Sequence, residues 1–114
     1  MRKLLVATLI AAASAVLATQ ALAATRSVKV GDDYFVRKGS IPTVTVTKGT
    51  KVTWRFAGKD MHNVAVTKGP AKFRSSYKSS GTYSKRVTRT GTYTIVCSIH
   101  QPDMTMKLRV TRLL

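Results

Sequence analysis

The chain has 114 residues, of which 20 are lysine or arginine and only 4 are aspartate or glutamate. This length allows one modest domain, and the single cysteine excludes a disulfide within the chain. A bound metal is then the remaining common means of stabilising so small a core, and no nucleic-acid-binding motif accompanies the basic composition.

The N-terminus has the organisation of a secretory signal peptide over residues 1–23. A basic start at residues 2–3 precedes an apolar run over residues 4–18, and Ala-Leu-Ala at residues 21–23 fits the pattern that signal peptidase recognises. A transmembrane anchor is the alternative, but the run is shorter than the ~20 apolar residues that a spanning helix needs. We therefore expect a periplasmic or otherwise exported domain over residues 24–114.

Removing that segment takes away two of the 20 basic residues, so 18 positive charges oppose 4 negative ones, a net charge of +14. The basic residues are scattered along the chain and form no single run. They either keep the surface soluble or steer the protein toward an acidic partner or an anionic membrane surface. The basic stretch over residues 68–85 has no role that the sequence assigns.

The rest of the chain predicts short strands separated by turns that contain glycine. Alternating or β-branched segments predict strands at residues 27–30, 34–37, 43–46, 51–56, 64–66, 83–87, 92–97 and 106–110. Lys48-Gly49 is expected to form a hairpin-like turn, and a brief strand is expected near Lys72-Phe73 within a long polar loop. Because no helical period is sustained, the pattern predicts an all-β sandwich.

Cys97 is the only cysteine, and it stands three residues before His100, one of two histidines. Three interpretations remain open for this pair: a buried structural thiol near a surface histidine, a nucleophilic cysteine activated by the histidine, and a metal site. The nucleophile would need a third group to orient the base, and Asp103 is the only acid nearby.

Two further residues favour the metal site. Met104 follows in the same loop, and His62, the other histidine, ends a different loop between strands. If the two loops meet at one end of the sandwich, two imidazoles and a thiolate can surround a metal with a thioether as a weak fourth ligand, which is the ligand set of a blue-copper centre. Zinc would more often take several thiolates or carboxylates, and this chain has too few.

Three stretches of the chain resemble the small type 1 copper proteins, the plastocyanin- and amicyanin-like cupredoxins. They are VTVTKGTKVTWRF at residues 44–56, DMHNVAV at residues 60–66 and GTYTIVCSIHQPDMTMKLRV at residues 91–110. The resemblance covers nearly all of residues 24–114. It implies a Greek-key β-sandwich of about seven to eight strands that binds one copper as Cu(I) or Cu(II).

The resemblance also implies a role for each site residue. His62, Cys97, His100 and Met104 would be the copper ligands. Asn63 would tie the His62 loop to the ligand loop and form a hydrogen bond near the sulfur of Cys97.

The spacing between His100 and Met104 departs slightly from the family pattern, which makes Met106 the rival axial ligand. Met104 is preferred because Met106 alternates with Leu108 and Val110, as a core residue of the last strand would.

The function implied is one-electron transfer between redox partners, without enzymatic activity. A copper-binding or copper-delivery protein is the alternative, although the chain lacks the Met- or His-rich tracts expected of one. The exposed edge of His100, surrounded by Ile99, Pro102 and Met61, would dock transiently against an acidic redox protein such as a cytochrome or an oxidoreductase. The domain is expected to be a monomer.

Overall fold

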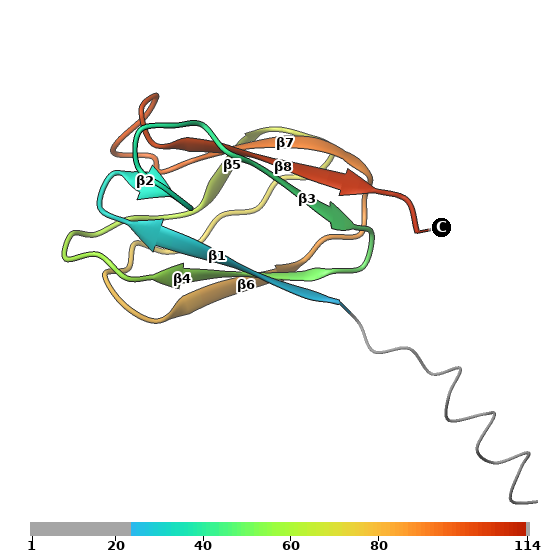
Figure 1. Ribbon diagram of the computed structural model, residues 1–114, viewed down its shortest axis with the longest axis horizontal. Helices are drawn as coiled ribbons and strands as arrows, with labels where there is room; N and C mark the ends of the chain where they lie inside the picture. Colours follow the sequence, from blue (N-terminus) through green and yellow to red (C-terminus); the bar gives the residue numbers. More distant parts are fainter. Residues whose placement is uncertain (1–23, 114) are drawn as a thin grey trace, which may run out of the picture.

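The computed structural model describes residues 24–113, and within this range every regular element is a β-strand (Figure 1). The strands are β1 (Thr25–Gly31), β2 (Tyr34–Phe35), β3 (Thr43–Thr47), β4 (Lys51–Phe56), β5 (Ala65–Lys68), β6 (Thr82–Arg86), β7 (Gly91–Val96) and β8 (Thr105–Thr111). The described residues contain no helix that is long and apolar enough to cross a membrane. The predicted signal peptide at residues 1–23 lies outside the described part of the chain.

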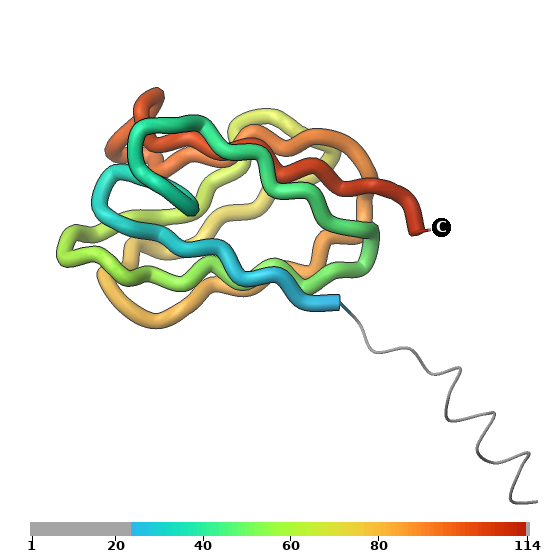
Figure 2. Tube along the Cα trace, viewed as in Figure 1, coloured from blue at the N-terminus to red at the C-terminus, as the bar shows by residue number. Residues whose placement is uncertain are grey.

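The strands form two mixed sheets of four, in the orders β2-β1-β4-β6 and β3-β8-β7-β5. The chain crosses repeatedly between the sheets, as the tube in Figure 2 shows, so β1 pairs with β4 and β3 pairs with β8 in parallel. The remaining pairs are antiparallel. The all-β Greek-key sandwich predicted from the sequence is confirmed.

The core lies between the two sheets, and the two-residue period of the strands fills it. In β4, Val52, Trp54 and Phe56 are buried while the residues between them face outward or are half-buried. In β8, Met106 and Leu108 are fully buried in the same alternating manner. Burying an aliphatic or aromatic side chain of this size stabilises a fold by roughly 1.5–3 kcal/mol.

The prediction of a hairpin turn at Lys48-Gly49 is wrong. β3 and β4 flank this turn, but β3 pairs with β8 in one sheet whereas β4 pairs with β1 and β6 in the other. Lys48-Gly49 therefore joins the two sheets, and Gly49 adopts a φ of 92° there. An alternating pattern identifies a strand but does not identify its partner.

Two other strands predicted from the sequence differ from those in the structure. The second strand ends at Phe35 because Val36 adopts a left-handed φ of 66°, which takes the chain out of the extended conformation. Near residues 72–73 no strand forms, and the polar loop makes only isolated bridges, between Ala65 and Arg74 and between His62 and Lys78.

The polar loop between β5 and β6 nevertheless closes one side of the core. Phe73 packs against Trp54 and Tyr93, with ring centroids 6.0 and 5.9 Å apart. Ser75 is buried, and its hydroxyl accepts a hydrogen bond of 2.9 Å from the backbone N–H of Val64. The loop therefore also holds the segment that follows His62.

Candidate metal centre

Three connections meet at one end of the sandwich, on the left in Figure 1: the β1–β2 turn, the segment from β4 to β5 and the loop from β7 to β8. His62, the first ligand predicted from the sequence, lies in the second connection and is buried. Cys97 directly follows β7, and its side chain is also buried. His100 lies three residues further along, with its side chain 30% exposed.

The structure brings these side chains together. The Sγ atom of Cys97 lies 3.3 Å from Nδ1 of His100 and 3.8 Å from Nδ1 of His62. One ligand atom from each of the three residues lies within 4.8 Å of the others. The same ring nitrogen of both histidines thus faces the thiol, although His62 and Cys97 are 35 residues apart in the sequence.

Met104 and Met106 occupy different surroundings, although both are fully buried. The backbone N–H of Met104 donates to the carbonyl of His100 (2.9 Å), and the N–H of Cys97 donates to the carbonyl of Met104 (3.1 Å), so Met104 closes the loop beside the cysteine. Met106 lies within β8, where its sulfur accepts a hydrogen bond of 3.5 Å from the indole N–H of Trp54 in the core.

Asn63 joins the two loops that carry the histidines and the cysteine. Its Oδ1 accepts a hydrogen bond of 2.7 Å from the backbone N–H of Ser98, and its Nδ2 donates to the hydroxyl of Ser98 at 3.1 Å. The Asn63 side chain is fully buried and Ser98 is half-buried, so both bonds are partly shielded from water. The contact fixes the position of the residue after Cys97 relative to the residue after His62.

Sequence reasoning missed two residues of this end, Asp32 and Asp33 in the β1–β2 turn. Asp32 Oδ1 lies 2.9 Å from Nε2 of His62, and Asp33 Oδ1 lies 3.4 Å from Nε2 of His100. Hydrogen bonds from His62 and from the backbone N–H groups of Lys59 and Asp60 hold the pKa of the Asp32 carboxyl well below its usual range. Gly31-Asp32-Asp33 signalled only a turn in the sequence, because its partners lie far away along the chain.

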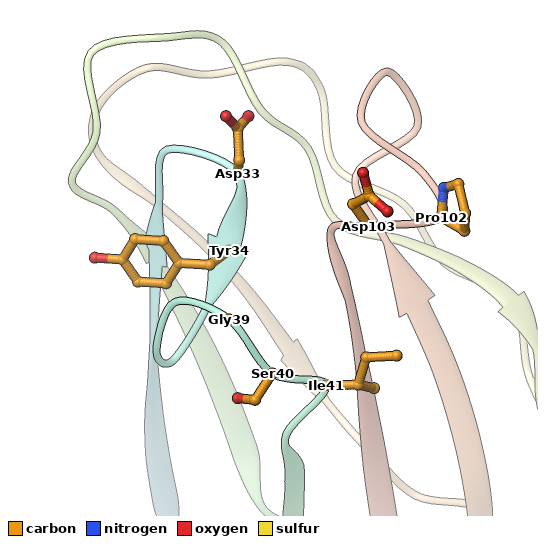
Figure 3. A pocket seen from close by; sticks show the side chains of 7 residues that line it. All are labelled: Asp33, Tyr34, Gly39, Ser40, Ile41, Pro102 and Asp103. Carbon is orange, nitrogen blue, oxygen red and sulfur yellow. The ribbon is translucent and has the colours of Figure 1, made fainter.

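The surface around His100 combines apolar and acidic side chains. Met61 and Ile99 are 50% and 56% exposed. Asp33, Asp60 and Asp103 line a shallow depression beside His100. Figure 3 shows an adjoining hollow, with Asp33 on the β1–β2 turn at one side and Pro102 and Asp103 on the β7–β8 loop at the other.

The donor set and its spacing fit a single transition-metal ion. Zinc–sulfur and zinc–imidazole bonds of ~2.3 and ~2.0 Å, meeting at about 100–125°, separate sulfur from nitrogen by roughly 3.3–3.8 Å. A first-row ion therefore fits the observed distances. One thiolate and two imidazoles with a nearby thioether are ligands that suit both oxidation states of copper. Mg²⁺ and Ca²⁺ prefer oxygen ligands such as carboxylates, and none of these four side chains supplies one.

Comparison with known proteins agrees with the geometry. The sequence model of the family described as copper binding proteins, plastocyanin/azurin family, matches residues 25–111. A search of curated protein sequences finds no match.

Solved structures with the same fold include two whose titles name copper. A point mutant of amicyanin in its Cu(I) form is 26% identical with a TM-score of 0.61, over 82% of this chain and 88% of amicyanin. The copper-containing nitrite reductase of Thermus scotoductus SA-01 is 25% identical with a TM-score of 0.63, over 83% of this chain but only 24% of the reductase. The family match extends over most of the chain, and the converging His-Cys-His set supplies the chemistry that the match requires. The chain belongs to the plastocyanin/azurin family of copper-binding proteins.

Proposed function

We propose that this protein is an exported type 1 copper protein that carries single electrons between redox partners. His62, Cys97, His100 and Met104 are its ligands, and residues 24–114 are its functional domain after removal of residues 1–23. The observation that carries the proposal is the convergence of both Nδ1 atoms on the Cys97 sulfur, at 3.3 and 3.8 Å. Copper bound there supplies a one-electron Cu(I)/Cu(II) couple.

The chain's own residues limit rearrangement around that couple. Cys97 and His62 are buried, and the backbone bonds from Cys97 to Met104 and from Met104 to His100 close the loop. Asn63 ties this loop to the His62 segment. Ligands held this firmly change position little between oxidation states, which favours rapid electron transfer.

The partly exposed His100 is the proposed route for the electron. Its side chain is 30% exposed, whereas the other proposed ligands are buried. Met61 and Ile99, which adjoin His62 and His100 in the sequence, are exposed apolar side chains that can supply a small contact area, which suits the brief encounters of redox proteins. The partner is proposed to be an acidic redox protein, since the net charge of the domain favours such a collision, and the protein is proposed to act as a monomer.

Titration of the mature protein with Cu(II) tests the proposal. We expect an intense visible band that saturates at one copper per chain and bleaches on addition of a mild reductant. Cys97→Ser should abolish the band, because the absorption arises from the bond between thiolate and copper. Met106→Leu is the matched control and should keep it. Weak, pale binding by the unsubstituted protein would overturn the proposal.

Copper delivery is the alternative function, and it is distinguished by exchange rather than by colour. A delivery protein should lose Cu(I) rapidly to a competing chelator, whereas an electron carrier should retain it through repeated cycles of oxidation and reduction. The burial of Cys97, His62 and Met104 favours retention. The nitrite reductase is an enzyme of which this chain matches only 24%, so its activity is not carried over.

A further inference from the structure

The β1–β2 turn reaches both histidines of the metal centre from the side opposite to the cysteine. Asp32 Oδ1 lies 2.9 Å from His62 Nε2, while Nδ1 of the same ring faces Cys97. Asp33, the next residue, lies 3.4 Å from His100 Nε2. These two are half of the four acidic residues in a chain that has 20 basic ones.

Asp32 is held in place by the backbone that leads to His62. The N–H of Lys59 lies 3.0 Å from both carboxylate oxygens, and the N–H of Asp60 lies 3.0 Å from Oδ1. Gly58 makes room for this arrangement, since a Cβ at that position would lie 2.1 Å from Asp32 Oδ1. The carboxylate is therefore fixed before a metal binds.

This contact determines where the proton of His62 resides. An ionised carboxylate only accepts hydrogen bonds, and a neutral imidazole carries one N–H. The proton must therefore lie on Nε2, which leaves the lone pair of Nδ1 directed toward Cys97 and free to bind a metal.

We propose that Asp32 is the positioning residue of the metal centre: it fixes His62 in its Nε2–H form and its fixed negative charge favours Cu(II) over Cu(I). This inference rests on the proposed function for the role of His62 as a ligand. A carboxylate behind a ligating histidine orients the ring and strengthens it as a donor. Asp33 plays a lesser part, because the distance is longer and both groups are more exposed to water.

Reduction potentials of three variants test the effect on copper. Asp32→Asn keeps the size of the side chain but removes its charge, and we expect about a tenfold shift of the copper couple toward Cu(I), equal to ~59 mV for one electron. Asp60→Asn is the matched control, since it removes a charge from the same end while its backbone N–H still reaches Asp32. Asp60→Asn and Asp33→Asn should each shift the couple by less than half as much. Equal shifts in all three variants would overturn the proposal.

A second measurement needs no copper, and its main observation is made on the unsubstituted protein. In metal-free, unsubstituted protein labelled with ¹⁵N, NMR should show an Nε2–H proton on His62 that exchanges slowly with water. Asp32→Ala should lose this slow exchange. A proton found on Nδ1 in the unsubstituted protein would overturn the inference. If the Cu(II) titration gave no blue band, the proposed function would be overturned. The position of the His62 proton would still be decided by the NMR spectrum.

Discussion

Met104 and Met106 are only two positions apart, yet their sulfur atoms serve different parts of the molecule. Met106 lies in β8, and the indole of Trp54 donates to its sulfur. Met104 precedes the strand and is tied by backbone hydrogen bonds to Cys97 and His100. The proposed axial ligand is therefore Met104, because the sulfur of Met106 already has a hydrogen-bond partner within the core.

Exchanging each methionine for leucine separates the two roles. Met104→Leu should change the reduction potential and the visible spectrum, since the axial ligand tunes both, while stability changes by less than about 1.5 kcal/mol. Met106→Leu should leave the spectrum unchanged and lower the free energy of unfolding by about 1–2 kcal/mol, through repacking and loss of the Trp54 hydrogen bond. Absorption spectra, voltammetry and urea unfolding of both variants measure these effects. The reverse pattern would make Met106 the axial ligand.

The sequence could predict the residues of the proposed ligand set but not their surroundings. His62, Cys97 and His100 are rare residue types in this chain, so their chemistry is visible without coordinates. Asp32 carries no such signal, because its importance arises from a fold that places the β1–β2 turn against a segment about 30 residues away.

At the scale of elements, strand positions could be predicted because side chains alternate with the two-residue period of a half-buried sheet. Pairing could not, since Lys48-Gly49 has the composition of a hairpin turn yet crosses between sheets. The end of β2 could not be predicted either, because the residue type of Val36 does not indicate its left-handed φ of 66°.

The segment between β4 and β5 offers a test of how an element supports the centre. Gly58→Ala should lower the free energy of unfolding by about 1–3 kcal/mol, because the added Cβ would lie 2.1 Å from Asp32 Oδ1. Chemical denaturation of the metal-free protein measures the loss.

The same substitution in an Asp32→Ala background supplies the control. Without the carboxylate, the added methyl group no longer meets Oδ1, so Gly58→Ala should cost less than it does in the original protein. The two effects should therefore fail to add. Strict additivity would mean that Gly58 is required for a reason other than room for Asp32.

At the scale of the whole molecule, charge is distributed unevenly. All four acidic residues, Asp32, Asp33, Asp60 and Asp103, lie on connections at the metal end, and three of them line the depression beside His100. The positive charge would therefore attract the proposed acidic partner from a distance, whereas the aspartates would oppose an acidic surface that contacts His100 directly. The sequence predicts the first effect from composition alone, but only the fold brings the aspartates together.

Ionic strength separates these two effects. With an acidic cytochrome, the bimolecular rate of electron transfer should fall by about an order of magnitude from low salt to ~0.5 M salt, since screening weakens the attraction between the molecules. At low salt Asp60→Asn and Asp103→Asn should increase the rate, and Lys59→Gln should decrease it. Stopped-flow mixing measures each rate, and near ~1 M salt, where the screening length is ~3 Å, the variants should converge. If Asp60→Asn instead slowed the reaction at low salt, the aspartates around His100 would be attractive contacts, and the natural partner would present a basic surface at its redox centre.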